Sequence, residues 1–266
     1  MLPDLPIMEV ACVATLRPEL LRTTLYSHAE NLFKEHISKI RLILNIDCAG
    51  LITGNHAEKD YKIAEILNIA NKLKFAEIQY RIVERQPHFG HAWWYVMNQA
   101  KTSFIFYLEE DWRLDMEIDL RKMFYFMAKN PTIAHLRLSA FKSETEHLKQ
   151  WNKFLTWNGN FFEVEPEERG VIGWAGHPSL NRRAFIRRVI DHVNPNMNPE
   201  KQIKGRRYDH PMNIILKQYR FGSFHPQNAP PAVVDIGRQW MVDNGFQKLG
   251  NKAFFTEWTR EGESEC

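Results

Sequence analysis

Short apolar runs alternate with stretches of helical periodicity through the first half of the chain. Four of these runs predict buried β-strands, at residues 9–14, 40–46, 78–83 and 103–108. Between the strands, apolar residues recur three or four positions apart and predict amphipathic helices, as at Ile63, Ile66, Ala70 and Leu73. Such an alternation of strands and helices is typical of an α/β fold with a parallel sheet and crossover helices.

The second half of the chain has a less regular pattern. Residues 133–138 predict a fifth strand, and residues 154–164 predict strands or a hairpin that turns at Asn158-Gly159. Residues 170–177 are rich in glycine and predict a loop or a bent strand.

Helices are expected in the second half as well. Asp115 is expected to cap a helix whose apolar stripe is Leu120, Phe124 and Met127. Another helix is expected at residues 185–193, and Asp209-His210-Pro211 predicts the start of a further one. Residues 224–236 are rich in proline and predict an irregular segment.

Composition and charge narrow this picture only a little. The chain has 266 residues with neither a linker-like stretch nor an internal repeat, which predicts a single domain over residues 1–266. The formal net charge of +3 permits an anionic ligand but does not require one. Three cysteines without metal-type spacing argue against a disulfide framework. No apolar window reaches about 18 residues and no signal peptide is recognisable, so we expect a cytoplasmic protein without membrane insertion.

Three carboxylates directly follow the fourth predicted strand. Glu109, Glu110 and Asp111 end the run Phe-Ile-Phe-Tyr-Leu-Glu-Glu-Asp. Like charges at the end of a buried strand repel one another and are costly to desolvate. A bound Mn²⁺ or Mg²⁺ would remove this repulsion, since both ions prefer oxygen ligands. Ligands of open α/β sheets bind outside the carboxyl ends of the strands, where this triplet lies; the alternative is a solvated acidic loop.

The acidic run resembles the Asp-x-Asp-type motif of GT-A glycosyltransferases, particularly those of the family-2-like type. The resemblance implies a GT-A (Rossmann-like) α/β fold with a mixed, mainly parallel sheet flanked by helices. It also implies that Asp111 holds the metal ion, while Glu109 and Glu110 face the ribose, the sugar or the waters of the ion. The middle residue departs from the family pattern, because it is Glu rather than Asp.

Three earlier segments are similar to further motifs of the same family. Residues 14–21 resemble the first-strand loop and helix start that clasp the nucleotide, which implies that Thr15 and Arg17 bind the donor. Asp47 closes the second strand, where the family often places an acid near the base or ribose. Residues 88–100 are similar to the Asn-x-Gly-x-x-x-Ala-x-Asn helix before the acidic motif and imply donor contacts at Gly90 and His91, although His88 and His91 depart from that pattern.

The resemblance also implies roles for three residues of the second half. Asp209 stands at a predicted helix start, where the family commonly places the carboxylate that deprotonates the acceptor hydroxyl. Its other interpretations are a plain helix cap or, in a retaining enzyme, an acceptor-binding group. His225 is a candidate third metal ligand, and Arg238 with Asp235 would fold over the diphosphate as part of a lid.

Together these likenesses imply an enzyme that transfers a hexosyl or pentosyl group from a nucleotide sugar, with UDP-sugar as the expected donor. Residues 1–115 would bind the nucleotide sugar and residues 116–266 the acceptor. A divalent cation would neutralise the departing diphosphate, and Arg17 would add a bidentate phosphate contact. Rival interpretations are a sugar nucleotidyltransferase, although residues 15–18 lack its glycine-rich loop, and a nucleic-acid- or carbohydrate-binding module without activity.

The acceptor is open between three classes. Basic side chains lie beside aromatic ones in the second half, a combination that a nucleic-acid acceptor would need: the basic residues of 201–207, Arg182, Arg183, Arg187, Arg188, Trp151, Trp157, Phe161 and Phe162. A compact enzyme of this kind resembles those with which phages glycosylate hydroxymethylated pyrimidines in DNA. A saccharide or a protein acceptor is equally compatible with these residues, and solvated helix faces would explain the basic side chains without any acceptor.

Overall fold

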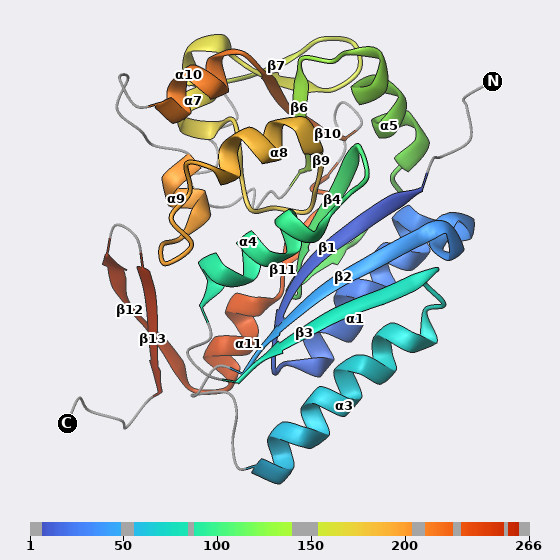
Figure 1. Cartoon of the computed structure of the whole chain (residues 1–266), viewed down its shortest axis with the longest axis vertical. Coiled ribbons are helices and arrows are strands. Elements are labelled where there is room, and N and C mark those ends of the chain that lie inside the picture. Colours follow the sequence, from blue (N-terminus) through green and yellow to red (C-terminus); the bar gives the residue numbers. More distant parts are fainter. Residues whose placement is uncertain are drawn as a thin grey trace.

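The structure is a computed structural model, and it describes residues 7–48, 56–84, 88–139, 154–203, 211–225, 230–252 and 255–260. Nine strands form one central sheet in the order β3-β2-β1-β4-β9-β6-β10-β8-β7 (Figure 1). Their bounds are β1 Met8–Thr15, β2 Ile40–Asp47, β3 Glu77–Val83, β4 Phe104–Glu109, β6 Ile133–Leu138, β7 Leu155–Trp157, β8 Phe162–Val164, β9 Ser179–Arg182 and β10 Arg220–Phe224.

All strands of this sheet except β8 and β9 point the same way. The prediction of an α/β fold with a mixed, mainly parallel sheet flanked by helices is therefore confirmed. Strand β1 lies at the centre of the parallel part and is buried along almost its whole length, as the continuous apolar run of the sequence requires. The expected hairpin at Asn158-Gly159 is present as β7 and β8, and Gly159 has the positive φ of +92° that its turn demands.

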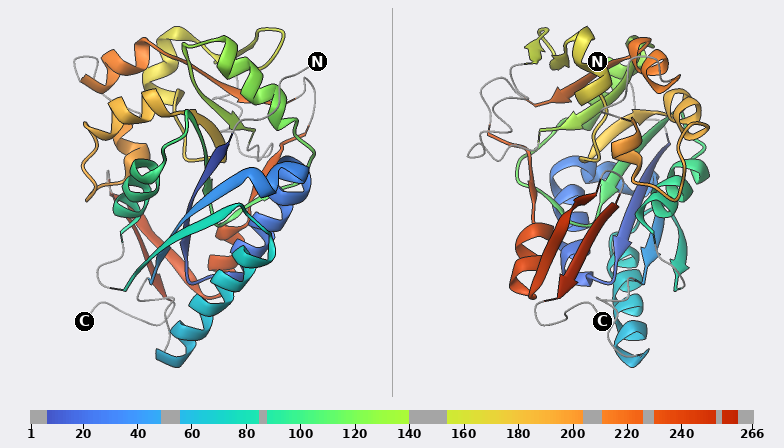
Figure 2. Two further views of the ribbon diagram at one scale, coloured as in Figure 1. Left: turned by 45° about the vertical axis from the view of Figure 1, so that its right-hand side comes forward. Right: turned by 90° about the vertical axis from the view of Figure 1, so that its left-hand side faces the viewer.

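Helices cover both faces of the sheet. One apolar layer contains residues of α1 (Pro18–His28), α3 (His56–Lys72) and α5 (Leu120–Lys129). The other contains residues of α4 (Phe89–Gln99), α8 (Arg183–Ile190) and α10 (Pro211–Lys217). In the left view of Figure 2, α4 lies on one side of the sheet and α1 and α3 lie on the other. The short helices α7 (Arg169–Ile172) and α9 (Pro199–Ile203) belong to the second half of the chain.

Two small sheets stand beside the central one. Strand β5 (Trp112–Leu114) pairs with β11 (Val233–Asp235), and β12 (Phe246–Lys252) pairs with β13 (Phe255–Arg260). Helix α11 (Gly237–Asp243) follows β11 directly. The prediction that residues 224–236 are wholly irregular was thus wrong, because β11 is stabilised by pairing with a strand that lies far away in the sequence.

The cap of helix α5 also differs from the expectation. The carboxylate of Asp119, not that of Asp115, accepts the hydrogen bond from the backbone N–H of Lys122 at 2.9 Å. Asp115 lies before the helix and pairs with the guanidinium of Arg113 at 2.5 and 2.8 Å. The cap therefore sits immediately before Leu120, where the helix begins.

The strand order sets the place of the functional site. From β1 the chain adds β2 and β3 on one side, and it then places β4 on the other side of β1. The connections that leave β1 and β4 diverge at their carboxyl ends, which leaves a crevice in which open α/β sheets bind their ligands.

Candidate active site

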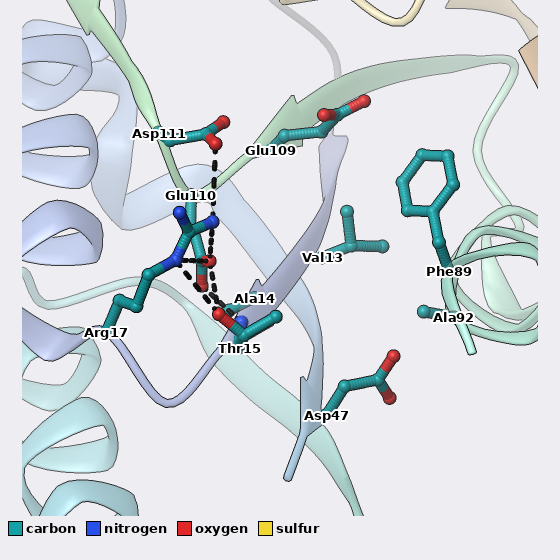
Figure 3. A pocket seen from close by; sticks show the side chains of 10 residues that line it. All are labelled: Val13, Ala14, Thr15, Arg17, Asp47, Phe89, Ala92, Glu109, Glu110 and Asp111. Atoms are coloured by element: carbon teal, nitrogen blue, oxygen red, sulfur yellow. Dashed lines mark hydrogen bonds and ion pairs between the residues drawn. The ribbon is translucent and has the colours of Figure 1, made fainter. Parts of the chain in front are cut away.

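A pocket of about 190 Å³ opens at the carboxyl ends of β1, β2 and β4 (Figure 3). Its lining residues come from these three strands, the loop after β1 and the first turn of α4: Val13, Ala14, Thr15, Arg17, Asp47, Phe89, Ala92, Glu109, Glu110 and Asp111. The structure therefore brings together six of the side chains that the sequence singled out, from segments up to about a hundred residues apart.

The Glu110 side chain links the end of β4 to the loop after β1. It is only 2% exposed, and its carboxylate accepts hydrogen bonds from the Thr15 hydroxyl and from Nε of Arg17, both at 2.6 Å. The backbone N–H of Thr15 and Nη2 of Arg17 contact the same carboxylate. Because all four donors come from the β1 loop, Glu110 fixes the position of Arg17 in the pocket. A shorter Asp at this position would have less reach toward that loop.

Glu109 points away from Arg17, whereas Asp111 lies on the same side of the pocket as the Arg17 guanidinium and contacts it (Figure 3). The Glu109 carboxylate accepts a hydrogen bond from the Tyr107 hydroxyl at 3.0 Å, and Oδ2 of Asp111 lies 3.3 Å from Nη2 of Arg17. Burial, followed by the negative charge of Asp111, raises the pKa of Glu109 well above its usual range. Burial also raises the pKa of Asp111 to about 6, although Arg17 opposes the shift.

The pairing of β5 with β11 brings Asp235 close to the acidic triplet. Asp235 lies opposite Trp112 in this ladder, and its negative charge contributes to the raised pKa values of Glu109 and Asp111. Its carboxylate accepts hydrogen bonds from the backbone N–H groups of Gly237 at 3.1 Å and Arg238 at 3.2 Å. Asp235 therefore orders the first turn of α11 beside the pocket.

Helix α11 packs directly against the triplet. A Cβ atom on Gly237 would lie 2.1 Å from Oδ2 of Asp111, so only glycine fits at this position. Trp240 donates a hydrogen bond to Glu19 at 2.5 Å, and the guanidinium of Arg17 lies 5.4 Å from the centre of its indole ring. The Arg238 side chain is 71% exposed and pairs with Asp235 at 2.9 Å, which leaves it at the rim of this region.

The second half of the chain reaches Glu109 through Gly176 and Glu200. A Cβ atom on Gly176 would lie 2.8 Å from Oε1 of Glu109, and the Gly176 N–H points to the Glu200 carboxylate at 3.4 Å. The charge of Glu200 is one of the causes that raise the pKa of Glu109. Sequence analysis selected neither Glu200 nor Gly237, because neither belongs to a local motif and both matter through long-range contacts.

Asp47, Gly90 and His91 were expected to contact the donor, and of these three only Asp47 lines the pocket. Asp47 lines the pocket and accepts a hydrogen bond from Asn45 at 2.7 Å, while burial raises its pKa to about 6. A ring nitrogen of His91 lies 2.7 Å from Oδ1 of Asn196. A Cβ atom on Gly90 would lie 2.3 Å from the carbonyl oxygen of Pro195, so this glycine permits close packing of two backbone segments. Neither Gly90 nor His91 is among the lining residues of the pocket.

His225 is not brought together with Asp111. It follows β10, its ring stacks on Phe162 at 4.5 Å, and it lines a different pocket that shares no residue with the one described above. Among the described residues, no three His, Cys, Asp or Glu side chains are arranged as a ligand set for a metal ion. Asp209, the predicted catalytic base, lies outside the described residues.

The arginines near β9 have structural partners. Arg182 donates to the backbone carbonyls of Ile133 at 2.9 Å and Asn130 at 3.0 Å, and Arg183 donates to the carbonyl of Ala100 at 2.9 Å. Arg187 and Arg188 are exposed on α8, where Arg187 donates to the Asn98 side chain and Arg188 donates to that of Gln218 at 2.6 Å. Two arginines of the basic group that suggested nucleic acid thus satisfy backbone carbonyls, and residues 204–207 of that group lie outside the described residues.

Solved structures of other proteins share this architecture. No protein-family model matches the sequence, and no curated protein matches it either. Solved structures do match. Residues 1–349 of TarS from S. aureus match with a TM-score of 0.51 and 14% identity over 85% of this chain and 59% of that chain. The same protein in complex with UDP-GlcNAc gives a TM-score of 0.53 at 14% identity, over 85% of this chain and 57% of that one.

A second match is the mannosyltransferase PcManGT from Pyrobaculum calidifontis, solved in complex with GDP-Man and Mn²⁺. Its TM-score is 0.55 at 10% identity, over 91% of this chain and 60% of that chain. The likeness establishes the fold. The chain spans about three fifths of the length of these proteins. Over the described residues, none of the helices has the length and apolarity needed to cross a membrane.

Proposed function

We propose that this chain is a metal-dependent glycosyltransferase that moves a hexosyl or pentosyl group from a nucleotide sugar, most simply a UDP-sugar, to an acceptor hydroxyl. The observation that carries the proposal is the convergence of Asp111, Glu109 and Arg17 on one pocket at the carboxyl ends of β1 and β4. This pocket lies in a fold shared with solved glycosyltransferases, of which TarS was solved with UDP-GlcNAc and PcManGT with GDP-Man and Mn²⁺.

The donor set at the triplet fits a hard divalent cation. The negative charge of Asp235 raises the pKa values of Glu109 and Asp111, and the charge of Asp111 raises that of Glu109 further. A positive ion at this place would relieve a repulsion that Arg17 offsets only in part at Asp111. Mg²⁺ usually takes only one or two protein carboxylates and completes its shell with substrate phosphates and waters. We assign Asp111 as the carboxylate that holds the ion, with Glu109 facing the sugar or the waters of the ion. When bound, the cation neutralises the departing diphosphate as a Lewis acid.

The other lining residues serve the nucleotide sugar. Arg17 is held against the triplet by Glu110 and offers its guanidinium to a phosphate oxygen. Thr15 and Asp47 flank the space for the ribose and the base, and His91 and Gly90 lie in the helix beyond them. Arg238 on α11 adds a cation at the rim that can approach the diphosphate.

The acceptor side rests on fewer observations. We keep Asp209 as the proposed base that accepts the proton of the attacking hydroxyl. The acceptor classes are a saccharide, a protein and a hydroxymethylated pyrimidine in DNA. Transfer of labelled sugar to each of these in parallel distinguishes them, and the absence of any DNA product would remove the DNA acceptor.

The decisive experiment is a thermal-shift panel of UDP- and GDP-sugars with and without Mn²⁺. A donor at a hundred times its Kd should stabilise the folded state by about 2.7 kcal/mol, and only when the metal is present. Asp111→Asn should abolish this stabilisation. Asp115→Asn is the matched control, because Asp115 pairs with Arg113 and does not line the pocket. Equal stabilisation of wild type and Asp111→Asn would reject the metal assignment.

Release of free sugar from the donor separates this function from its rivals. Metal-dependent hydrolysis of a nucleotide sugar in the absence of acceptor indicates a transferase. Formation of a nucleotide sugar from a nucleoside triphosphate and a sugar phosphate would indicate a nucleotidyltransferase instead. A protein that binds the donor but catalyses neither reaction would be a binding module.

A further inference from the structure

A second pocket lies between the start of α5, the β7–β8 hairpin and the end of β10. Its volume is about 380 Å³, twice that of the pocket at the acidic triplet, and the two have no lining residue in common. The side chains that define its chemistry are Glu117, Asp119, Lys122, Trp157, Asn160 and His225. No role proposed above uses this pocket.

The two pockets also lie at different places along the sheet. The first is lined by residues of β1, β2 and β4, and the second by Trp157 of β7 and Phe224 of β10. Strands β9 and β6 separate β4 from β10 in the sheet. A ligand in the second pocket would therefore not occupy the place of a donor in the first.

Trp157 and His225 line one side of the second pocket, and both rings contact Phe162. The ring of Phe162 stacks on that of His225 at 4.5 Å with an angle of 13° between the planes, and the Trp157 ring lies 5.0 Å from Phe162 with a tilt of 56°. His225 is only 6% exposed and Trp157 is half-buried, so the inner rings fix the indole in place while part of it faces the pocket. A rigid, partly exposed indole is a platform for flat apolar surfaces, either the C–H face of a sugar ring or a nucleobase.

The charges of the pocket distinguish these two ligands. Its lining holds two carboxylates, Glu117 and Asp119, and the single ammonium group of Lys122, while Lys34 pairs with Glu117 from outside the lining. The pocket therefore has no excess of positive charge. Proteins that bind nucleic acids through stacked bases combine the aromatic platform with an excess of Lys and Arg for the phosphates. Carboxylates repel phosphates but accept hydrogen bonds from hydroxyl groups, and the Asn160 amide can both donate and accept. The lining therefore suits a neutral, hydroxyl-rich ring.

We propose that this pocket is a saccharide-binding site, with Trp157 as the stacking platform and Asn160, Asp119 and Glu117 as hydroxyl-binding groups. The site holds a saccharide unit apart from the place where sugar transfer is proposed. It does not depend on the proposed function, because a protein without transferase activity would bind the saccharide equally well.

The test measures direct binding of two neutral oligosaccharides, chitotriose and maltotriose. Binding is measured by saturation-transfer NMR and by calorimetry, in the absence of nucleotide and metal. At least one probe should bind in the millimolar range, and Trp157→Ala should weaken it at least tenfold. Asn160→Ala, a change at an exposed turn residue, should weaken it severalfold without disturbing the fold. Tyr61→Ala is the matched control, because Tyr61 is a 66% exposed aromatic on α3, remote from the pocket lining.

Three results would overturn the proposal. The first is that neither saccharide binds the wild-type protein. The second is that both saccharides bind Trp157→Ala and Asn160→Ala as well as they bind wild type. The third is that a single-stranded oligothymidylate binds in place of the saccharides and that Trp157→Ala abolishes binding of the oligothymidylate, which would make the pocket a nucleic-acid site. Donor hydrolysis is measured on the same samples. Its absence with saccharide binding intact would refute the transferase alone, and its presence without saccharide binding would refute this site alone.

Discussion

The two halves of the molecule place their buried charges differently. In the first half, Arg17, Glu110 and Asp111 converge on one pocket and interact with one another. In the second half, Arg182 and Arg183 point to backbone carbonyls. Arg17 therefore lines a pocket together with carboxylates, whereas Arg182 and Arg183 satisfy backbone carbonyls.

The difference follows from the backbone of each half. Parallel strands bring their carboxyl ends to one edge of the sheet, so charged residues that follow separate strands meet there. In the second half, Arg182 and Arg183 donate to carbonyls of Asn130 and Ala100, directly after the ends of α5 and α4, where helices leave carbonyl groups without intrahelical partners. The planar fork of arginine can satisfy several such carbonyls at once. A count of basic residues therefore does not reveal which of them are available to a ligand.

The largest effect is expected for Glu110→Gln. This change breaks the buried pair with Arg17 and should cost about 3–5 kcal/mol of unfolding free energy, measured by urea denaturation. Glu65→Gln is the control, because its pair with Arg22 lies at the surface and should contribute less than about 1 kcal/mol. Equal losses for the two variants would mean that the Glu110 contacts do not organise the first half.

Glu110→Asp separates the reach of the Glu110 side chain from its charge. It keeps the negative charge but shortens the side chain by one methylene, so it tests the reach rather than the charge of the carboxylate. We expect a donor KM that rises more than kcat falls, because Arg17 would lose its fixed position while Asp111 stays in place. A variant with wild-type KM would show that Asp serves as well as Glu at this position.

The next largest effect concerns the contact between α11 and the triplet. A Cβ at position 237 would overlap Oδ2 of Asp111, so Gly237→Ala should displace that carboxylate. A misplacement of about 1 Å can reduce a rate about a hundredfold, and we expect a loss of this size in donor hydrolysis. Gly159→Ala is the control in the second half: it strains a positive φ but meets open space, so it should leave hydrolysis unchanged. Similar rates for Gly237→Ala and wild type would place Asp111 outside the catalytic region.

A smaller, pH-dependent effect is expected for Asp47→Asn. The pKa of Asp47 is raised from 3.8 to about 6 by burial, so the folded state holds a proton between these values that the unfolded state has released. Stability from this group is present at low pH and is lost as the pH rises through about 6. Near pH 7, Asp47→Asn should therefore be more stable than wild type by up to about 3 kcal/mol, with little difference near pH 4. Chemical denaturation at both pH values measures this, and a stability gap that does not change with pH would contradict the shift.

Local patterns predicted the first half well. The strands at residues 9–14, 40–46 and 103–108 are β1, β2 and β4, because a fully buried parallel strand needs a continuous apolar run that is visible in the sequence. The gathering of Thr15, Arg17, Asp47 and the acidic triplet follows from the strand ends alone. Which way each acid points did not follow from the sequence, since Glu110 and Asp111 contact Arg17 in the loop after β1, whereas Glu109 accepts from Tyr107.

The second half was harder to predict because its order comes from distant partners. Strand β11 exists through its pairing with β5, more than a hundred residues earlier, and Gly237 matters only because Asp111 lies beside it. The apolar pattern of residues 224–236 predicts neither the pairing of β11 with β5 nor the contact of the following Gly237 with Asp111. The histidine at position 225 likewise gave no sign that its ring would stack on Phe162 rather than approach the triplet.

The smallest effect is expected for the exposed arginines of the second half. Arg187 and Arg188 are exposed on α8, and replacing both by Gln should change the unfolding free energy by less than about 0.5 kcal/mol. If they contacted DNA phosphates, the slope of log K against log salt would fall by about 1.8, since each phosphate contact contributes about 0.9. We expect no change in that slope for a fluorescent duplex, because a solvated helix face explains both side chains. Arg182→Gln gives the contrast, since it removes hydrogen bonds to carbonyls and should lower stability. A reduced slope of log K against log salt in the double variant would show that Arg187 and Arg188 contact DNA phosphates. Helix α8 would then be part of a binding site for a nucleic-acid acceptor.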